Sequence, residues 1–317
     1  MTDPKKQTRL EYWLALASVE GLGGVRIKRL LKRFGSVQAI FEAELPEIAR
    51  LPTFNPVLAS RILTVAGNFP NFRERLTTLA DQNVRVRCLD DPDYPAQLKD
   101  LPDTPGILCS VGTLTEVSER CVSIVGTRAP SIAGIEVTLS LATQLALAGF
   151  TVVSGLAPGI DTYAHAGTLA ALGTTIAVIG TDLSAIYPTQ KNSLAKKITD
   201  HGCIFSEHPF YTAASPGNLV QRNRIISGLS IATIVIEAKE NGGAMHTARY
   251  AELQGRHVMA CRWGQEHPQR EGPAALIQKG AFPFAPDGVD RVIEMLKNPE
   301  QLERPGNGAD IEQPSLF

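Results

Sequence analysis

Residues 121–161 decide the fold: the stretch begins with CVSIVGTRAPS and ends with TVVSGLAPGID. Two apolar runs, 122–125 and 151–153, each end at a glycine turn, and a helix-compatible stretch, 135–148, lies between them. This order predicts a βαβ unit whose two turns open at the same edge of a parallel sheet. Glycine lets the backbone approach a ligand, and the amides of the turn and of the next helix N-terminus face an anion. The unit therefore predicts an anion-binding edge, where Arg128 offers a guanidinium fork to a phosphate.

The composition is that of an ordinary globular protein. The chain has 317 residues, 44% hydrophobic and 20% charged, which is enough for a sizeable core and a small accessory domain. Lys and Arg number 31 and Asp and Glu 32, so the net charge is −1, and nucleic-acid binding must come from a local patch. Neither a membrane-spanning apolar run nor an apolar signal core is present, so we expect a cytoplasmic protein without membrane contact.

The residue types that bind metals are not spaced as a metal site. The five cysteines make no C-x-x-C pair, and several lie in apolar runs, so we expect them to be reduced and structural. His208, His246 and His257 have no metal-ligand spacing. No G-x-G-x-x-G or G-K-[ST] motif occurs, which disfavours a dinucleotide or a P-loop site. We therefore expect neither a metal nor a cofactor.

Residues 1–80 are predicted to form a small all-helical domain. The segment VEGLGGVRIKRLLKRFGS resembles a helix-hairpin-helix, in which a glycine hairpin exposes helix N-terminal amides to a DNA phosphate and flanking cations add charge. A weaker second copy lies at 47–63, where Phe54 and Asn55 replace the glycines. The candidate DNA contacts of the first copy are Gly23, Gly24, Arg26, Lys28 and Lys32. The alternative is a solvated basic face on a helix that packs against the core.

Beyond this domain we predict a connector, a large α/β domain and a flexible tail. Residues 81–119 hold one short strand, VRVRCL, and are then dense in Pro, Asp and Gly. Residues 120–298 alternate strand and helix, and the strands are nearly continuous apolar runs, which indicates a doubly wound, mostly parallel, Rossmann-like sheet. The polar tail is 299–317. The strands predicted in the large domain are 122–126, 151–155, 175–180, 203–206, 231–237, 257–261 and one near 282–284.

Polar clusters follow the carboxyl ends of these strands, where ligands bind in an open parallel sheet. They form a predicted phosphate cradle made of Gly126, Thr127, Arg128, Ser154, Gly155, Arg222, Asn223, Arg224, Gly242, Gly243 and Thr247. Two roles are open for Asp161, a helix N-cap and a ligand contact, and we favour the N-cap. His165 is expected to be packed inside its helix. Glu207 and Glu237 are a possible acid/base pair, but no nucleophile is apparent beside them.

Several motifs, in order and spacing, resemble the DprA/Smf (DNA-processing protein A) family: SIVGTRAPS, VVSGLAPGIDTYAH, TIAVIGTDLSAIYP, FSEHP, QRNRIISGLS, VIEA and ENGGAMHTARYAELQGRHV. The resemblance covers roughly residues 90–285 and implies a Rossmann-like domain that binds and protects single-stranded DNA, helps to load RecA in natural transformation, forms homodimers and is not an enzyme. It also implies a phosphate contact from Asn192, one residue later than the family places it.

The chain departs from that family at several positions. Pro158 replaces a frequent basic residue, Leu219 and Val220 replace Phe and Pro, and we expect the C-terminal winged helix that many members carry to be missing here. Arg262 and Trp263 replace Pro-Gly, and Trp263 is predicted either to stack a base or to cover the end of the sheet.

Two other functions stay open at this point. Related nucleotide hydrolases of the lysine-decarboxylase-like group carry P-G-G-x-G-T-x-x-E, but Tyr250 stands at the position of the catalytic Glu, which argues against hydrolysis. The second is a sensor of nucleotide ligands, possible in phage defence, on the same kind of fold.

Overall fold

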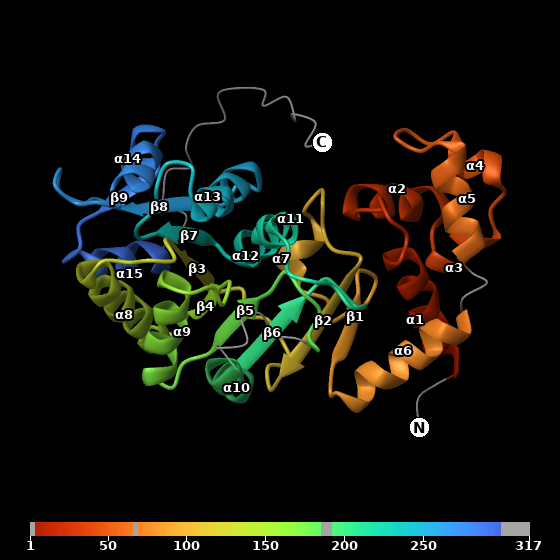
Figure 1. Ribbon diagram of the computed structural model, residues 1–317, viewed down its shortest axis with the longest axis horizontal. Helices are drawn as coiled ribbons and strands as arrows, with labels where there is room; N and C mark the ends of the chain where they lie inside the picture. The colour runs from red at the N-terminus through yellow and green to blue at the C-terminus, as the bar shows by residue number, and fades with distance from the viewer. Residues whose placement is uncertain (1–3, 66–68, 185–191, 299–317) are drawn as a thin grey trace.

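The computed structural model describes residues 4–65, 69–184 and 192–298. Its N-terminal part is helical, at the right of Figure 1, and packs around a core that includes Trp13, Leu30, Ile40 and Ile62. This confirms the predicted helical region. Its helices are α1 (Pro4–Ala17), α2 (Gly24–Phe34), α3 (Val37–Glu42), α4 (Leu45–Ala49), α5 (Pro56–Thr64) and α6 (Phe69–Asp81).

Local signals set the helix ends in this region. Gly35 ends α2 in a conformation with φ of +82°, which favours glycine, and Ser36 then caps α3 by accepting from the amide of Ala39. Asn55 caps α5 through the amide of Leu58, and Pro56 occupies the first helical position. The two hairpins therefore form even though the second one lacks glycines.

The rest of the chain builds one nine-stranded sheet in the order β1-β2-β6-β5-β4-β3-β7-β8-β9. Seven strands, from β6 to β9 in this order, run parallel, whereas β1 and β2 pair antiparallel at one end (Figure 1). The mostly parallel α/β fold is thus confirmed. The strands are β1 (Arg85–Cys88), β2 (Ile107–Gly112), β3 (Cys121–Val125), β4 (Thr151–Ser154), β5 (Thr175–Val178), β6 (Gly202–Ser206), β7 (Ala232–Val235), β8 (His257–Cys261) and β9 (Phe282–Phe284).

Sequence patterning missed one strand, β2. Its residues ILCSVG follow a stretch rich in Pro and Asp, so the apolar run was taken as part of a connector. In the structure β2 pairs with β6, from Cys109 opposite Ser206 to Gly112 opposite Cys203, and it extends the sheet toward the helical region. The boundaries of the helical domain, the connector, the α/β domain and the tail remain a prediction from the sequence.

Helices cover both faces of the sheet, because alternate strand residues point to opposite sides. In β3, Cys121 and Val125 join the core on one face, whereas Val122 and Ile124 join the core on the other. One face carries α8 (Ile132–Leu147), α9 (Ile160–Ala170), α10 (Asn192–His201) and α15 (Val289–Lys297); the other carries α7 (Ala96–Lys99), α12 (Asn223–Leu229), α13 (Gly243–Leu253) and α14 (Glu271–Gln278) (Figure 1).

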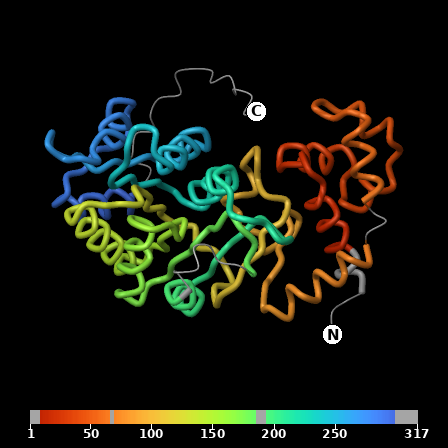
Figure 2. Tube along the Cα trace, in the orientation of Figure 1, coloured from red at the N-terminus to blue at the C-terminus, as the bar shows by residue number. Residues whose placement is uncertain are grey.

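The helical region is tied to the sheet at its β1 end (Figure 2). Arg75 of α6 donates to the carbonyl oxygen of Pro209 at 2.6 Å, and the rings of Phe72 and Phe210 lie 5.9 Å apart. On α2, the Lys28 ammonium donates to the carbonyl oxygen of Leu101 at 2.6 Å. These contacts fix the helical region against the segments that follow β1 and β6.

We predict that the five thiols resist modification until the chain unfolds. All five are buried, and burial raises the pKa of Cys109, Cys121, Cys203 and Cys261 to about 12. Since the folded state holds these protons more tightly, the stability they contribute is complete below pH 9.0 and is lost as pH rises toward about 12. The rate of thiol titration with and without urea, and urea melts at rising pH, measure both effects. Rapid modification of the folded chain would contradict this prediction.

Candidate nucleic-acid interface

A cavity of about 440 Å³ opens where the strand order reverses around β3. In the sheet β3 lies between β4 and β7, and the loops that follow these three strands surround the cavity, which is where an open α/β sheet binds ligands. The start of α12 and the start of α13 complete it. Its lining residues are Val125, Gly126, Thr127, Arg128, Ala157, Asp161, Pro216, Leu219, Val220, Arg222, Asn223, Ile226, Ala238, Lys239, Gly242, Gly243, Ala244 and Thr247.

The loop after β3 forms the first wall, as the sequence predicted. Thr127 donates its amide to the carbonyl oxygen of Glu237 at 2.7 Å and accepts from the amide of Ile160 at 3.1 Å. Gly126 leaves no room for a Cβ, which would lie 2.5 Å from the Ile160 side chain. Arg128 is exposed, and among the described residues no hydrogen bond or ion pair engages its guanidinium. The wall therefore presents a free cation above a fixed backbone.

Glu237 holds this wall from below through contacts within the protein. Its carboxylate, fully buried, accepts from the amide of Ser131 at 3.0 Å and from the Ser131 hydroxyl, and lies 3.0 Å from Nε2 of His267. Nδ1 of His267 accepts from the amide of Gln269, so in the neutral ring Nε2 carries the proton. A histidine in that tautomer cannot take a proton from Ser131. Ser131 is the N-cap of α8, and its hydroxyl is bonded to the buried carboxylate of Glu237. Among the described residues Glu237 and Glu207 have no hydrogen-bond partner in common.

Arg222 and Asp161 form the floor of the cavity. Arg222 is 5% exposed and donates to the carbonyl oxygen of Val178, while one oxygen of Asp161 accepts from the amides of Gly155 and Ala157. Burial lowers the pKa of Arg222 and raises that of Asp161, and each charge partly offsets the shift of the other. Asp161 is the second residue of α9, after the N-cap Gly159, so the predicted capping role is wrong.

Ser154 and Gly155 do not contact the cavity, contrary to the predicted cradle. Ser154 is fully buried and donates its hydroxyl to the carbonyl oxygen of Ile124 at 2.7 Å. Gly155 is needed because any Cβ would collide with the Arg222 guanidinium. These two residues leave room for the side chains that form the floor of the cavity, and neither is placed to contact a phosphate there.

Arg224 also lies outside the predicted cradle. It is 4% exposed, and its guanidinium binds Glu207 through two hydrogen bonds of 2.9 and 2.6 Å, on the side away from the cavity. Burial alone would lower the pKa of Arg224, but the ion pair with Glu207 outweighs it and raises that pKa. The helical backbone at Arg222, with φ of −61° and ψ of −22°, explains the divergence, because residues two apart on a helical turn point in nearly opposite directions.

The opposite wall is the N-terminus of α13 with the start of α12. Gly242 is the N-cap of α13 and has no side chain to bond the first-turn amides, so these face the cavity and suit an anion. Asn223 donates to the carbonyl oxygen of Gly243 at 3.3 Å and joins the two helices. Lys239 is exposed and lines the cavity. The sequence prediction missed Lys239, although its place in the polar segment that follows β7 was a usable signal.

Trp263 does not line this cavity, and the predicted contact from Asn192 falls outside the described side chains. Trp263 donates Nε1 to the carbonyl oxygen of Ile236 at 2.6 Å and stacks on His267 with ring centroids 4.1 Å apart, so one face of its ring is covered within the protein, and its stacking on a base remains a prediction. Asn192 begins α10, but its side chain lies outside the described residues, as do residues 185–191. Pro158 is exposed and does not line the cavity.

The first hairpin of the helical region faces the sheet region, which corrects two predicted DNA contacts. Gly24 is buried against the carbonyl of Thr104, and Lys28 donates to the carbonyl oxygens of Lys99 and Leu101. The Arg26 guanidinium donates hydrogen bonds to the carbonyl oxygens of Gly21 and Thr53. Gly23 and Lys32 remain exposed. The hairpin backbone therefore comes close to the loop at Thr104, and this close approach serves packing between the helical region and the sheet region.

Gly24→Ala is expected to destabilise the chain by about 2 kcal/mol, because the new Cβ overpacks against the backbone of Asp103 and Thr104. Gly23→Ala is the matched control, since a Cβ there meets nothing within 4 Å and the backbone is extended. Urea denaturation measures both. Equal stability of the two variants would show that the hairpin does not pack as described.

Histidines and carboxylates do not form a metal site in the described part of the chain. His165 is buried in α9 and shares a hydrogen bond of 2.7 Å with the hydroxyl of Thr175, as its position in the sequence predicted. No helix among the described residues is both long and apolar enough to cross a membrane.

Comparison with known proteins points in one direction. Residues 85–297 match the family described as DNA recombination-mediator protein A, and residues 14–67 match the SAM-like helix-hairpin-helix tandem. Protein Smf of Synechocystis is 37% identical over 274 residues, covering 85% of this chain and 69% of that protein. DNA processing protein DprA of Bacillus subtilis is 38% identical over 214 residues, covering 67% and 72%.

Two solved structures show the same architecture. The X-ray structure of DNA processing protein A from Streptococcus pneumoniae has a TM-score of 0.72 at 30% identity, and the match covers 89% of this chain and 97% of that one. DNA processing protein A from Helicobacter pylori, whose structure is described in terms of its single-stranded DNA binding mode, has a TM-score of 0.60 at 28% identity, covering 67% and 96%.

Proposed function

Because the chain belongs to the DprA/Smf family of DNA recombination-mediator proteins, we propose that it binds single-stranded DNA at the cavity around β3, protects that DNA and assists its loading onto a recombinase. The observation that carries the proposal is the pairing of two exposed cations, Arg128 and Lys239, with the uncapped N-terminus of α13 around one cavity. Each of these groups attracts a phosphate.

The shape and lining of the cavity favour a single strand over a duplex. Its lining includes apolar side chains, Leu219, Val220 and Ile226, as well as the cations Arg128 and Lys239. A nucleotide matches such a site, since its phosphate meets the cations and its base meets the apolar side chains. A paired base is held within the duplex, whereas an unpaired one can turn into a cavity of about 440 Å³.

We propose that the site binds without turnover. The two carboxylates that follow β6 and β7, Glu207 and Glu237, are each held by other residues, Arg224 in one case and Ser131 with His267 in the other. A general acid or base must reach its substrate, and neither carboxylate lines the cavity. The proposal also includes the cytoplasm as location, where chromosomal DNA is processed, and a RecA recombinase as partner, both by family resemblance.

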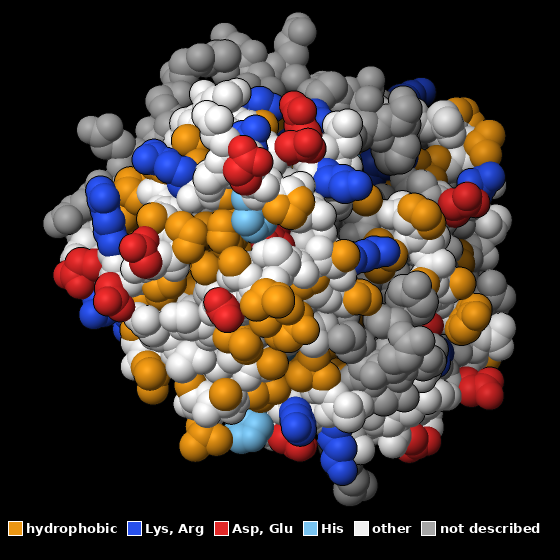
Figure 3. Space-filling view, turned by 60° about the vertical axis from the view of Figure 1, so that its left-hand side comes forward, with side chains coloured by type: hydrophobic (Ala, Val, Ile, Leu, Met, Phe, Trp, Pro, Cys, Tyr) orange, Lys and Arg blue, Asp and Glu red, His pale blue; other side chains and the backbone are white. Residues whose placement is uncertain are grey.

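A homodimer is part of the same proposal. Figure 3 shows the side that lies to the left in Figure 1, where hydrophobic side chains gather near the middle and charges of both signs lie around them. α8 also exposes Ile132 and Leu147, at 78% and 74%. Such exposed apolar area supports association. Light scattering during gel filtration tests it, and a monomer over the whole accessible concentration range would contradict it.

Anisotropy titration of a labelled oligothymidylate over a series of salt concentrations tests the DNA-binding proposal. We expect an affinity that falls with salt, with a slope of roughly −0.7 for each phosphate contacted, and weaker binding to a duplex of the same length. Mononucleotides and cyclic nucleotides are titrated in parallel by thermal shift. Stabilisation by small nucleotides alone would replace this proposal with a nucleotide sensor, and release of free base would replace it with a hydrolase.

A further inference from the structure

We propose that Arg224 is a positioning residue for the single-stranded DNA site. It fixes the start of α12, where Arg222 and Asn223 face the cavity, and it ties this wall to the loop on which the helical region rests. The inference rests on the proposed function for its ligand, but the placement of Arg224 behind the wall does not depend on it.

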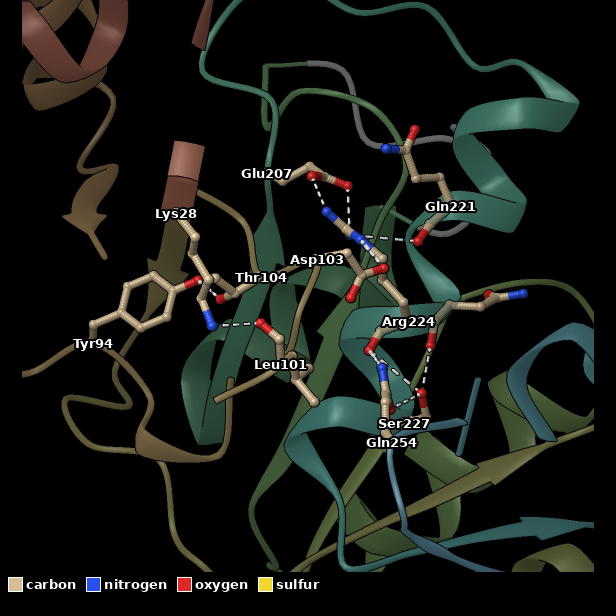
Figure 4. Close-up of polar contacts among 11 residues, drawn as sticks. Lys28, Tyr94, Leu101, Asp103, Thr104, Glu207, Gln221, Arg224, Ser227 and Gln254 are labelled. Atoms are coloured by element: carbon tan, nitrogen blue, oxygen red, sulfur yellow. Dashed lines mark hydrogen bonds and ion pairs between the residues drawn. The ribbon is translucent and has the colours of Figure 1, made fainter. Parts of the chain in front are cut away.

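All edges of the Arg224 guanidinium are used. Nη1 and Nη2 bind the two carboxylate oxygens of Glu207, and Nε lies 3.3 Å from Oδ2 of Asp103 (Figure 4). Glu207 follows β6, whereas Asp103 belongs to the loop between α7 and β2. Arg224 therefore joins three segments that are far apart in the sequence. A planar fork is required for this arrangement, because an ammonium cannot form paired hydrogen bonds to one carboxylate and still reach a second one.

The main chain of Arg224 is fixed as well. Its carbonyl oxygen accepts from the side-chain amide of Gln254 at 2.8 Å, and the other end of that amide accepts from the hydroxyl of Ser227 at 2.7 Å (Figure 4). α12 has only seven residues, all buried, and a helix that short does not hold its place by itself. Since Arg222 and Asn223 directly precede Arg224, the anchoring of α12 sets where these two side chains meet the cavity.

The same loop that offers Asp103 also receives the helical region. Lys28 of α2 donates to the carbonyl oxygens of Lys99 and Leu101, and Gly24 packs on Thr104. Tyr94 also holds this loop, because its hydroxyl donates to the carbonyl oxygen of Pro105 at 2.7 Å. Figure 4 shows Lys28 and Tyr94 beside this loop, with Arg224 beyond Asp103. The helical region thus supports the DNA site from behind through one loop and one arginine.

The salt dependence of binding separates positioning from contact. We expect Arg224→Gln to weaken oligothymidylate binding by about tenfold while the slope of log affinity against log salt stays that of the parent chain, because no phosphate contact is lost although a positive charge is removed. Arg128→Ala is the comparison variant, since loss of a direct contact should lower the slope by about 0.7. A slope loss in Arg224→Gln would make Arg224 a direct DNA contact and overturn the proposal. Unchanged affinity would overturn it too.

Asp103→Asn keeps the test valid where Arg224→Gln does not fold. Asp103 is 38% exposed at its side chain, so the substitution removes one ion pair without emptying the core. We expect about threefold weaker binding, an unchanged salt slope and faster amide hydrogen exchange in residues 219–229, while the strands β3 to β5 keep their protection. Exchange that stays as in the parent, or that rises throughout the sheet, would contradict a positioning role. This exchange readout needs no ligand, so it gives its answer even where the parent chain binds no DNA.

Discussion

Joint replacement of Arg128 and Lys239 by alanine is expected to weaken single-stranded DNA binding about a hundredfold near physiological salt. These two cations line the cavity and are exposed, whereas Arg222 is buried and already bonded to Val178. A phosphate that enters the cavity therefore finds two cations able to move toward it. The salt slope should fall by about 1.4 in the double variant, and by about half of that in each single variant.

Lys32→Ala is the matched control for this experiment. Lys32 is an exposed cation of the helical region, and its removal changes the net charge of the chain as each single variant does. If only the overall charge mattered, Lys32→Ala would weaken binding as Lys239→Ala does. We expect binding and slope close to those of the parent. Near-normal binding by the double variant would instead place the DNA elsewhere on the molecule, and circular dichroism melts would exclude a folding defect.

The position of the site could be predicted because it follows from topology. Apolar runs that end in glycine turns indicated parallel strands, and the carboxyl ends of parallel strands meet at one edge. That argument correctly brought the loop at 126–128 and the loop at 242–247 together around β3. It could not distinguish residues that line the edge from residues that support it, because both kinds follow the same strands.

Arg222 faces the cavity and Arg224 does not, and this difference depends on helix geometry that the sequence pattern did not reveal. Both were expected to reach one phosphate because they seemed to precede a helix. In the structure α11 (Pro216–Gln221) leads directly into α12, so Arg222 already has helical backbone and Arg224 points away from it. The role of Gly24 could not be predicted from the sequence for a related reason. A glycine hairpin that can approach a phosphate can approach a carbonyl equally closely, and only the tertiary structure decides between them.

Gly159→Ala is expected to cost about 3 kcal/mol of stability and to reduce DNA binding strongly. Gly159 has φ of +84° and ψ of −134°, a conformation that an alanine adopts only with strain. An added Cβ would also lie 2.7 Å from the Cα of Arg128 and closer still to the carbonyl oxygen of Thr127. The strain and the collision act on the same loop, so the variant should move Arg128 away from the cavity as it destabilises the fold.

Gly255→Ala separates the two contributions to that loss. Gly255 also has a positive φ, +66°, but a Cβ there meets nothing within 4 Å, so only the backbone strain of about 1 kcal/mol applies. We expect Gly255→Ala to bind oligothymidylate like the parent chain, and Gly159→Ala to bind weakly even at temperatures where urea melts show it folded. If both variants lose the same stability and both keep full binding, then Gly159 does not hold the Thr127–Arg128 loop. In that case the first wall of the site must be fixed by the backbone bonds of Thr127 to Glu237 and Ile160 and by the bond between Glu237 and Ser131.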